Sequence, residues 1–191
     1  MKHRISIGVA NALQYFGTME TNAFSKNPTQ IIRDDHRRLI GLFRQSEAAP
    51  LRAPETQNEI YQEIFAEIEI HSQIEEKVFY PELLAAADEM GDGRLRSWLE
   101  QGIENHQWID QAVRGLKVLD SDSESFGDQF AELRERFETH LHEEEQEVLP
   151  NAEKLILKRG EEIAKKMRSF RKSGAPGIQA PNGGEQKRTV A

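Results

Sequence analysis

Two ten-residue stretches of the chain, which begin at His71 and His140, are near copies of each other. Each places its histidine four residues before one glutamate and five before another, with a proline ten residues after the histidine. A further histidine precedes each stretch, His36 by 35 residues and His106 by 34. Imidazoles and carboxylates that converge from several helices are what a buried transition-metal site needs. The repeat therefore indicates metal binding.

The candidate ligands are His36, His71, Glu75, His106, His140 and Glu144. A single histidine on an apolar face is more often a hydrogen-bonded core residue, but here each predicted helix carries one. Burying all six polar groups is unfavourable unless each has a partner, and a single metal centre would provide partners for all of them. Imidazole and carboxylate suit iron, manganese or zinc rather than calcium or magnesium. Six ligands suit two ions, each taking two histidines, with the two glutamates bridging.

Apolar residues recur at steps of three and four in the segments that must position these ligands. The pattern predicts helices that start at Asn27, run over about 54–89 and 92–119, and carry an apolar stripe over 126–148. Each of these four helices has one candidate histidine on its inner face near mid-length.

Residues that favour helix starts and helix ends mark the limits of the predicted helices. Asn27 before Pro28 and Asp92 are predicted N-caps, and Gly91 is a predicted terminator. Pro81 and Pro150 follow the repeated stretches, and each should kink or break its helix after the site.

The predicted fold is all-α: an antiparallel up-down four-helix bundle made of two repeated helix pairs. We expect an N-terminal arm over 1–26, the bundle over 27–171 with a C-terminal helical extension around Gly160, and a disordered tail over 172–191. The arm either packs on the bundle or serves as a lid or partner contact.

Composition excludes several classes of function. The formal net charge of −8 repels phosphate backbones, so we expect no nucleic-acid partner. The chain has no cysteine, which excludes disulfides, thiolate metal sites and iron–sulfur clusters. No apolar run approaches the roughly 20 residues of a membrane span, and the first residues are a poor signal peptide. We expect a cytoplasmic protein that has no membrane partner.

These motifs resemble those of the hemerythrin-like, or HHE cation-binding, domains, over about residues 28–170. The resemblance lies in the segments Asp34-Asp35-His36, His71-x-x-x-Glu75 with Tyr80-Pro81, Asn105-His106, and His140-x-x-x-Glu144 with Leu149-Pro150. The family implies a four-helix bundle that holds a non-haem diiron centre.

By this resemblance, His36 and His71 would hold one iron and His106 and His140 the other. Glu75 and Glu144 would bridge the two ions, with an oxo, hydroxo or water ligand between them. Zinc or manganese are alternative metals.

One departure from the oxygen-carrying members of the family concerns the third helix. Those members have a second histidine one turn after the first, whereas this chain has Asp110. Either Asp110 is an extra ligand or a coordination position is left to solvent or substrate. The set of four histidines and two glutamates instead resembles diiron proteins linked to nitric oxide and iron–sulfur repair, which usually carry a cysteine-bearing N-terminal segment.

Several other residues lie close to the candidate ligands in the predicted helices. Glu76 and Glu145 lie about 100° around the helix from Glu75 and Glu144, so we expect them to support the site or face solvent, with direct ligation as the alternative. We expect His142 to be solvated. Tyr15 or Tyr80 could donate a hydroxyl near the site, although core packing is the preferred interpretation of Tyr80. As a hypothesis, Asp34, Asp35 and Glu104 could accept the free N–H of a ligand imidazole.

The sequence predicts a diiron protein that binds, senses or reacts with a small oxidant, namely dioxygen, peroxide or nitric oxide. The alternatives are an enzyme that decomposes peroxide or donates iron for iron–sulfur repair, and a storage bundle that holds zinc. An unidentified electron donor is a further candidate partner, and whether the protein is an enzyme stays open.

Overall fold

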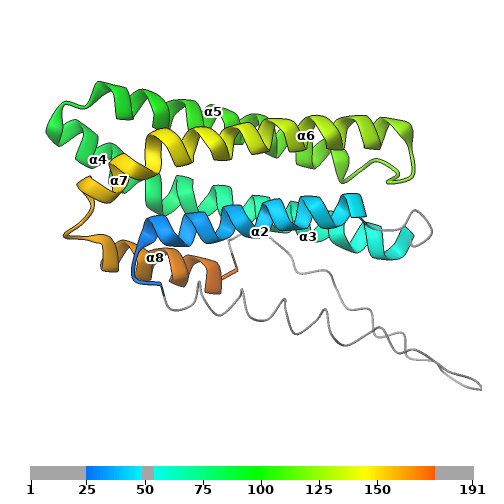
Figure 1. Ribbon diagram of the computed structural model, residues 1–191, viewed down its shortest axis with the longest axis horizontal. Coiled ribbons are helices and arrows are strands. Elements are labelled where there is room, and N and C mark those ends of the chain that lie inside the picture. The colour runs from blue at the N-terminus through cyan, green and yellow to red at the C-terminus, as the bar shows by residue number, and fades with distance from the viewer. Residues whose placement is uncertain (1–24, 49–53, 175–191) are drawn as a thin grey trace, which may run out of the picture.

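Long antiparallel helices packed side by side make up the computed structural model, which describes residues 25–48 and 54–174 (Figure 1). Within these residues the bundle has four long helical segments, which we call rods. The first rod is α2 (Pro28–Ala48). The second is α3 (Pro54–Ile74), and it continues through the π-helix η1 (Glu75–Phe79) into α4 (Tyr80–Met90). The third rod is α5 (Gly93–Leu116). The fourth is α6 (Glu124–Glu143), and it continues through the π-helix η2 (Glu144–Val148) into α7 (Leu149–Leu155). The helix α8 (Gly160–Lys172) packs against α2, α3 and η1. The predicted all-α bundle with a C-terminal helical extension is confirmed.

Capping side chains explain where several helices begin and end. Asn27 Oδ1 accepts a hydrogen bond from the Thr29 backbone N–H, and Asp92 Oδ1 accepts one from the Leu95 N–H, so both predicted N-caps are confirmed. Gly91 ends α4 in the left-handed region at φ 68°, as predicted. Ser123 is the N-cap of α6.

The chain stays helical through Pro81 and Pro150, so neither proline breaks its helix, and the part of the prediction that expected a break was wrong. Proline lacks an N–H and its ring crowds the carbonyl four residues earlier. A π-helical turn precedes each proline, in which the Tyr80 N–H bonds the Glu75 carbonyl and the Leu149 N–H bonds that of Glu144. The departure from α-helical geometry therefore starts at the candidate ligands Glu75 and Glu144 themselves.

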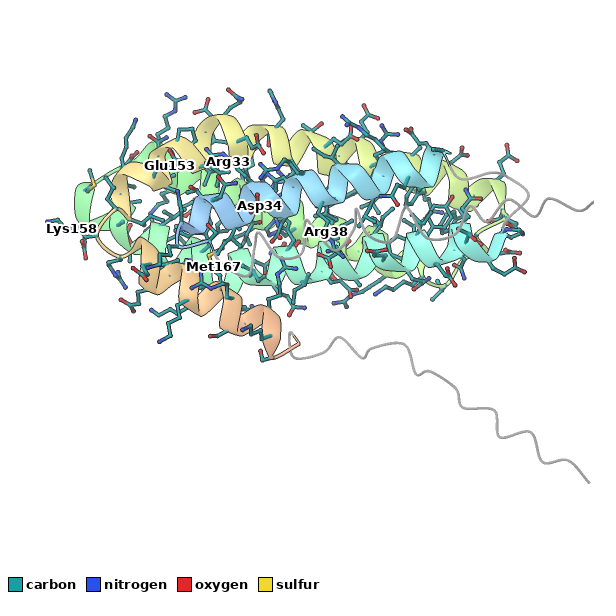
Figure 2. The ribbon with its side chains drawn as sticks, turned by 60° about the horizontal axis from the view of Figure 1, so that its bottom comes forward. Arg33, Asp34, Arg38, Glu153, Lys158 and Met167 are labelled. Carbon is teal, nitrogen blue, oxygen red and sulfur yellow. The ribbon has the colours of Figure 1, made fainter. Side chains whose placement is uncertain are left out.

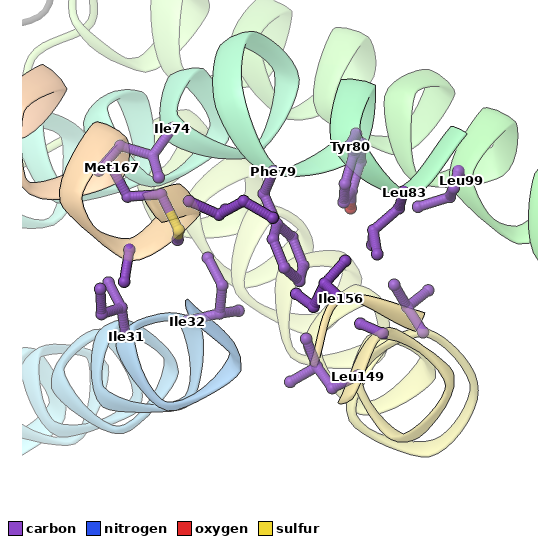
Figure 3. Packing of buried hydrophobic residues seen from close by; sticks show 14 of the residues in the cluster. Ile31, Ile32, Ile74, Phe79, Tyr80, Leu83, Leu99, Leu149, Ile156 and Met167 are labelled. Carbon is purple, nitrogen blue, oxygen red and sulfur yellow. The ribbon is translucent and has the colours of Figure 1, made fainter. Parts of the chain in front are cut away.

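Two hydrophobic clusters fill the bundle on either side of the candidate ligands. One cluster, which we call the proline-end cluster, includes Ile32, Phe79, Leu149 and Met167. Figure 3 shows these side chains from α2, η1, α7 and α8 gathered together. The other, which we call the aromatic cluster, is made by these residues: Leu39, Leu42, Phe43, Tyr61, Ile64, Phe65, Ile68, Ile109, Val113, Leu116, Phe126, Leu133, Phe137 and Leu141. The histidines and glutamates form a polar layer between the two clusters.

Charged side chains cover the outside of the bundle (Figure 2). Arg33 of α2 pairs with Glu153 of α7, which also accepts a hydrogen bond from the Thr29 hydroxyl. In the part of the chain that the structure describes, no helix combines the length and apolar composition needed to cross a membrane.

The predicted division into arm, bundle and tail stays a prediction. Residues 1–24 of the arm and 175–191 of the tail lie outside the described residues, as does Tyr15, one of the two tyrosines that could donate a hydroxyl near the site.

Candidate metal centre

The six candidate ligands come together in the middle of the bundle from four rods. His36 lies on α2, His71 on α3, His106 on α5 and His140 on α6, and the two glutamates open η1 and η2. Each of the six residues is at most 2% exposed. Since the helices run antiparallel and each histidine lies near mid-length, their imidazoles meet at one level.

The ligand atoms fall into two groups that could each hold a cation. His36, His71, Glu75 and Glu144 offer atoms within 4.8 Å of one another, and so do Glu75, His106 and His140. Glu75 Oε2 is 3.4 Å from His71 Nε2 and 3.2 Å from His106 Nε2, so this carboxylate lies between the two groups.

Glu144 is placed less evenly between the two histidine pairs. Its Oε2 lies 3.2 Å from His36 Nε2 and 3.8 Å from His140 Nε2. His140 Nε2 in turn lies 2.9 Å from His106 Nε2. Glu144 is therefore closer to the first group than to the second.

Many nitrogen and oxygen atoms of this layer are buried without a hydrogen-bond partner among the described residues. They include both carboxylate oxygens of Glu75, Oε2 of Glu144, and Nε2 of His36 and of His71. Leaving such atoms unpaired in a protein interior is strongly unfavourable. Imidazole nitrogens and carboxylate oxygens are also the donors that iron, manganese and zinc accept. The residues present therefore fit a metal centre.

The second glutamate of each repeat contacts the outer nitrogen of a histidine from the other repeat. Glu145 Oε1 lies 3.0 Å from His36 Nδ1, and Glu76 Oε1 lies 3.2 Å from His106 Nδ1. Neither belongs to the two groups whose ligand atoms converge. The structure thus places Glu76 and Glu145 behind the imidazoles, where they can fix ring orientation and raise basicity.

Asp35 lies near His71 but makes no hydrogen bond to it, because the Nδ1 atom of that histidine has no hydrogen-bond partner among the described residues. Asp35 Oδ2 lies 4.0 Å from His71 Nδ1, and the same oxygen accepts a hydrogen bond from Arg171 of α8. Asp34 and Glu104 are the other two candidate acceptors for the free N–H of a ligand imidazole. Asp34 pairs with Arg37 instead, and Glu104 is exposed.

Asp110 does not reach the cluster. Its side chain is 45% exposed and pairs with Arg114 at 2.8 Å. A position four residues after His106 is turned about 40° around the helix, and here that turn carries the carboxylate towards solvent. His142 is exposed, as expected from its place on the charged face.

Tyr80 packs in the proline-end cluster, as the preferred interpretation predicted, and its hydroxyl also reaches the polar layer. The residue is 1% exposed, and its hydroxyl donates a hydrogen bond to Glu144 Oε1. Its ring stacks on His106 with an interplanar angle of 5°. One sequence signal could have indicated this role: Tyr80 occupies the position in the first repeat where the second has Leu149.

Burial and mutual charge divide the histidines into two kinds. Burial lowers the pKa of His36 and of His106, but their contacts with Glu144 and Glu145, and with Glu75 and Glu76, outweigh it and raise each pKa to about 9. Burial lowers the pKa of His140 to about 3 and that of His71 well below its usual value. One imidazole of each pair therefore holds a proton readily and the other does not.

The two glutamates also differ. Burial, followed by the charge of Glu144, raises the pKa of Glu75 to about 8. Burial acts in the same direction on Glu144, but His140 and His36 outweigh it and hold the pKa of Glu144 well below its usual range.

A groove between α5 and α6 reaches the cluster at His140. Its volume is about 380 Å³, and its other lining residues include Trp108, Glu132, Arg136 and Glu143. The Arg136 guanidinium lies 4.1 Å from the centre of the Trp108 ring. This groove gives one histidine of the second group an approach from outside.

The family model of the hemerythrin HHE cation-binding domain matches residues 27–152. The chain therefore belongs to the hemerythrin HHE cation-binding domain family, and its buried histidine–glutamate cluster is compatible with the metal site that the family name implies.

Among solved structures, the fold is similar to that of a hemerythrin HHE cation-binding domain-containing protein from Mycobacterium kansasii. The TM-score is 0.64 at 22% sequence identity, over 78% of this chain and 86% of that one. At this identity the likeness concerns the fold alone. No curated protein matches the chain significantly.

Proposed function

We propose that this chain is a dinuclear non-haem iron protein that binds, senses or reacts with dioxygen, peroxide or nitric oxide. His36 and His71 would hold one iron, His106 and His140 the other, and Glu75 and Glu144 would lie between them. The observation that carries the proposal is the layer of buried imidazoles and carboxylates from four helices, many of whose nitrogen and oxygen atoms have no hydrogen-bond partner among the described residues.

Iron held there would supply one-electron redox chemistry and a coordination position for a small ligand. The chain's own contribution is to orient the donors and to exclude water. Glu76, Glu145 and Asp35 stand behind three of the imidazoles, and the two hydrophobic clusters close the layer on both sides.

The size of the enclosed layer favours a small oxidant over an organic substrate. The cluster residues are almost completely buried, and the described groove reaches them only at His140. An organic substrate needs a concave pocket at the reacting centre, whereas a diatomic molecule or a peroxide does not.

Stopped-flow spectroscopy of the anaerobic ferrous protein tests the proposal and separates its alternatives. Mixing with dioxygen should give a new visible spectrum, and a species that reverses on removal of oxygen would favour a binding or sensing role. Rapid one-way oxidation, with turnover of added peroxide, would favour a peroxide-decomposing enzyme. Protein isolated with two zinc ions and no spectral response would contradict the proposal and favour the storage bundle.

The iron-donating alternative has its own readout. Ferrous protein mixed with a cluster-free iron–sulfur acceptor, sulfide and a chelator should keep its iron if the centre is a resident cofactor. Transfer of iron to the acceptor faster than to the chelator would favour the repair role instead.

A further inference from the structure

The two repeats are alike in their candidate ligands but differ nine residues after each histidine. Tyr80 follows His71 at this distance, and Leu149 follows His140. Both side chains are buried, at 1% and 0% exposure, so neither position is a surface position that varies freely. Only the first repeat therefore carries a hydroxyl into the polar layer.

A second difference between the repeats makes room for that hydroxyl. Gly102 lies four residues before His106, and a methyl group added at Gly102 would lie 2.7 Å from the Tyr80 hydroxyl oxygen. The matching position, four residues before His36, is Ile32, which is completely buried. Figure 3 shows Tyr80 on one side of the proline-end cluster and Ile32 and Leu149 across from it. Gly102 thus leaves space for the phenol of Tyr80, whereas the aliphatic side chains of Ile32 and Leu149 fill the matching positions in the other half of the bundle.

The hydroxyl acts on one glutamate only. Tyr80 donates to Oε1 of Glu144, so one oxygen of that carboxylate is already engaged. Both oxygens of Glu75 are buried without a hydrogen-bond partner among the described residues. Glu75 can therefore reach both metal positions, whereas Glu144 offers its Oε2, which lies nearer His36 than His140.

The convergent groups of ligand atoms reflect this difference. The group around His36 and His71 contains both carboxylates, and the group around His106 and His140 contains Glu75 alone. The second position is thus one protein ligand short of the first. The Tyr80 ring stacks on His106, so the phenol packs against a candidate ligand of the position that is short of one.

We propose that Tyr80 is a positioning residue: its hydroxyl holds Glu144 towards the His36–His71 pair, which makes the two metal positions unequal and leaves the His106–His140 position open to an added small ligand. This inference rests on the proposed dinuclear centre. It does not follow from the repeat, which predicts two equivalent positions.

Anaerobic calorimetric titration of the metal-free protein with Co²⁺ tests the inference without use of any activity. The wild type should bind two ions with clearly unequal affinities. In Tyr80→Phe, Glu144 Oε1 is released to reach the second position, so the ratio of the two affinities should fall by about tenfold, the usual scale for residues that orient metal ligands. Tyr61→Phe is the matched control, because it removes the hydroxyl of another buried tyrosine, one in the aromatic cluster that accepts a hydrogen bond from Gln57, and should leave the ratio unchanged.

The outcomes separate this inference from the proposed function. Two ions with an unchanged affinity ratio in Tyr80→Phe would overturn the role of Tyr80 and leave the dinuclear centre standing. A wild type that binds no Co²⁺ would overturn both. A phenolate-to-iron charge-transfer band in the ferric wild type that Tyr80→Phe removes would make Tyr80 a direct ligand and would also overturn the positioning role.

A second variant covers the case in which Tyr80→Phe does not fold. Gly102→Ala keeps the phenol but forces its hydroxyl away from its present place, because the new methyl group would meet it. The affinity ratio should then fall in the same direction, and an unchanged ratio would count against the inference.

Discussion

The half of the metal centre formed by α2 and α3 and the half formed by α5 and α6 carry the same ligand types but different supports. In the first half, Asp35 lies 4.0 Å from His71 and is itself paired with Arg171 of α8. In the second half, His140 lines an open groove, and Tyr80 lies against His106. The repeat thus supplies the same donors to both halves, while residues that differ between the halves, such as Tyr80 and Arg171, make them unequal.

The largest expected effect concerns the glutamate that both halves share. Glu75→Ala should abolish binding of both ions, because Glu75 belongs to both groups of ligand atoms. Glu144→Ala should also reduce metal content sharply but should retain more metal than Glu75→Ala, because the second group does not depend on Glu144. Metal analysis of the purified variants gives the comparison.

His142→Ala is the matched control for the ligand His140, two residues earlier on α6. Its side chain is exposed, so its removal should leave the metal content at the wild-type level. If His142→Ala emptied the centre and His140→Ala did not, the assignment of inward-facing residues on α6 would be wrong.

The next effect is the pH dependence of metal affinity, which should be similar for the two halves of the centre. His36 and His106 have pKa values raised to about 9, and the pKa of Glu75 is raised to about 8, so all three groups hold protons at pH 7. A cation must displace these protons, so its affinity should rise with pH and level off above about pH 9. We expect at least about a tenfold loss of affinity per pH unit below pH 8.

Titration with Co²⁺ at several pH values in two buffers of different ionisation enthalpy measures this proton release. Release of fewer protons at pH 9.5 than at pH 7 agrees with the raised pKa values. An affinity that does not change between these pH values would show that the imidazoles are already free of protons.

A smaller effect should follow from detaching α8 from the first half. Arg171→Ala leaves the carboxylate of Asp35, which is 1% exposed, without its guanidinium partner. Loss of a charged partner from a buried group typically costs about 1–3 kcal/mol of unfolding free energy. Affinity for the first ion should fall as well, because the carboxylate of Asp35 lies 4.0 Å from His71 Nδ1 and its displacement would alter the surroundings of that imidazole.

Urea unfolding and Co²⁺ titration measure the two consequences separately. Lys166→Ala removes another cation from α8, one that pairs with Glu82 and Glu162 at the surface, and should change neither. If Arg171→Ala lowered the stability without any change in metal affinity, α8 would be a structural element only.

The smallest effect concerns the glycine that makes room for Tyr80. Gly102→Ala should destabilise the protein by about 1 kcal/mol, because the clash with the phenol exceeds the gain in helix propensity. The cost should shrink in a Tyr80→Phe background, where the closest remaining ring atoms lie 3.1 and 3.2 Å from the new methyl group. Gly41→Ala, where nothing lies within 4 Å, should instead stabilise α2. Thermal unfolding of the four variants measures the coupling.

Much of this structure could be predicted from the sequence because local patterns specify it. Steps of three and four between apolar residues give the rods, and capping residues such as Asn27 and Asp92 give their first turns. A histidine and a glutamate four residues apart must share a helix face, so the convergence of His71 with Glu75 and of His140 with Glu144 follows from helix geometry.

The parts that could not be predicted depend on long-range contacts or on alternative backbone geometries. Arg171 and Asp35 are 136 residues apart in the chain, and nothing local indicates their pairing. The π-helical turns at Glu75 and Glu144 let the helices continue through prolines that, by local rules, should interrupt them. Asp110 shares the period of His106, but it lies at the surface, where it pairs with Arg114.

Anomalous diffraction at the iron edge from crystals of the iron-loaded protein tests the central claim most directly. The account predicts two peaks inside the bundle, one coordinated by His36 and His71, the other by His106 and His140, with Glu75 between them. The absence of peaks in this layer, or iron bound only by other residues, would contradict it.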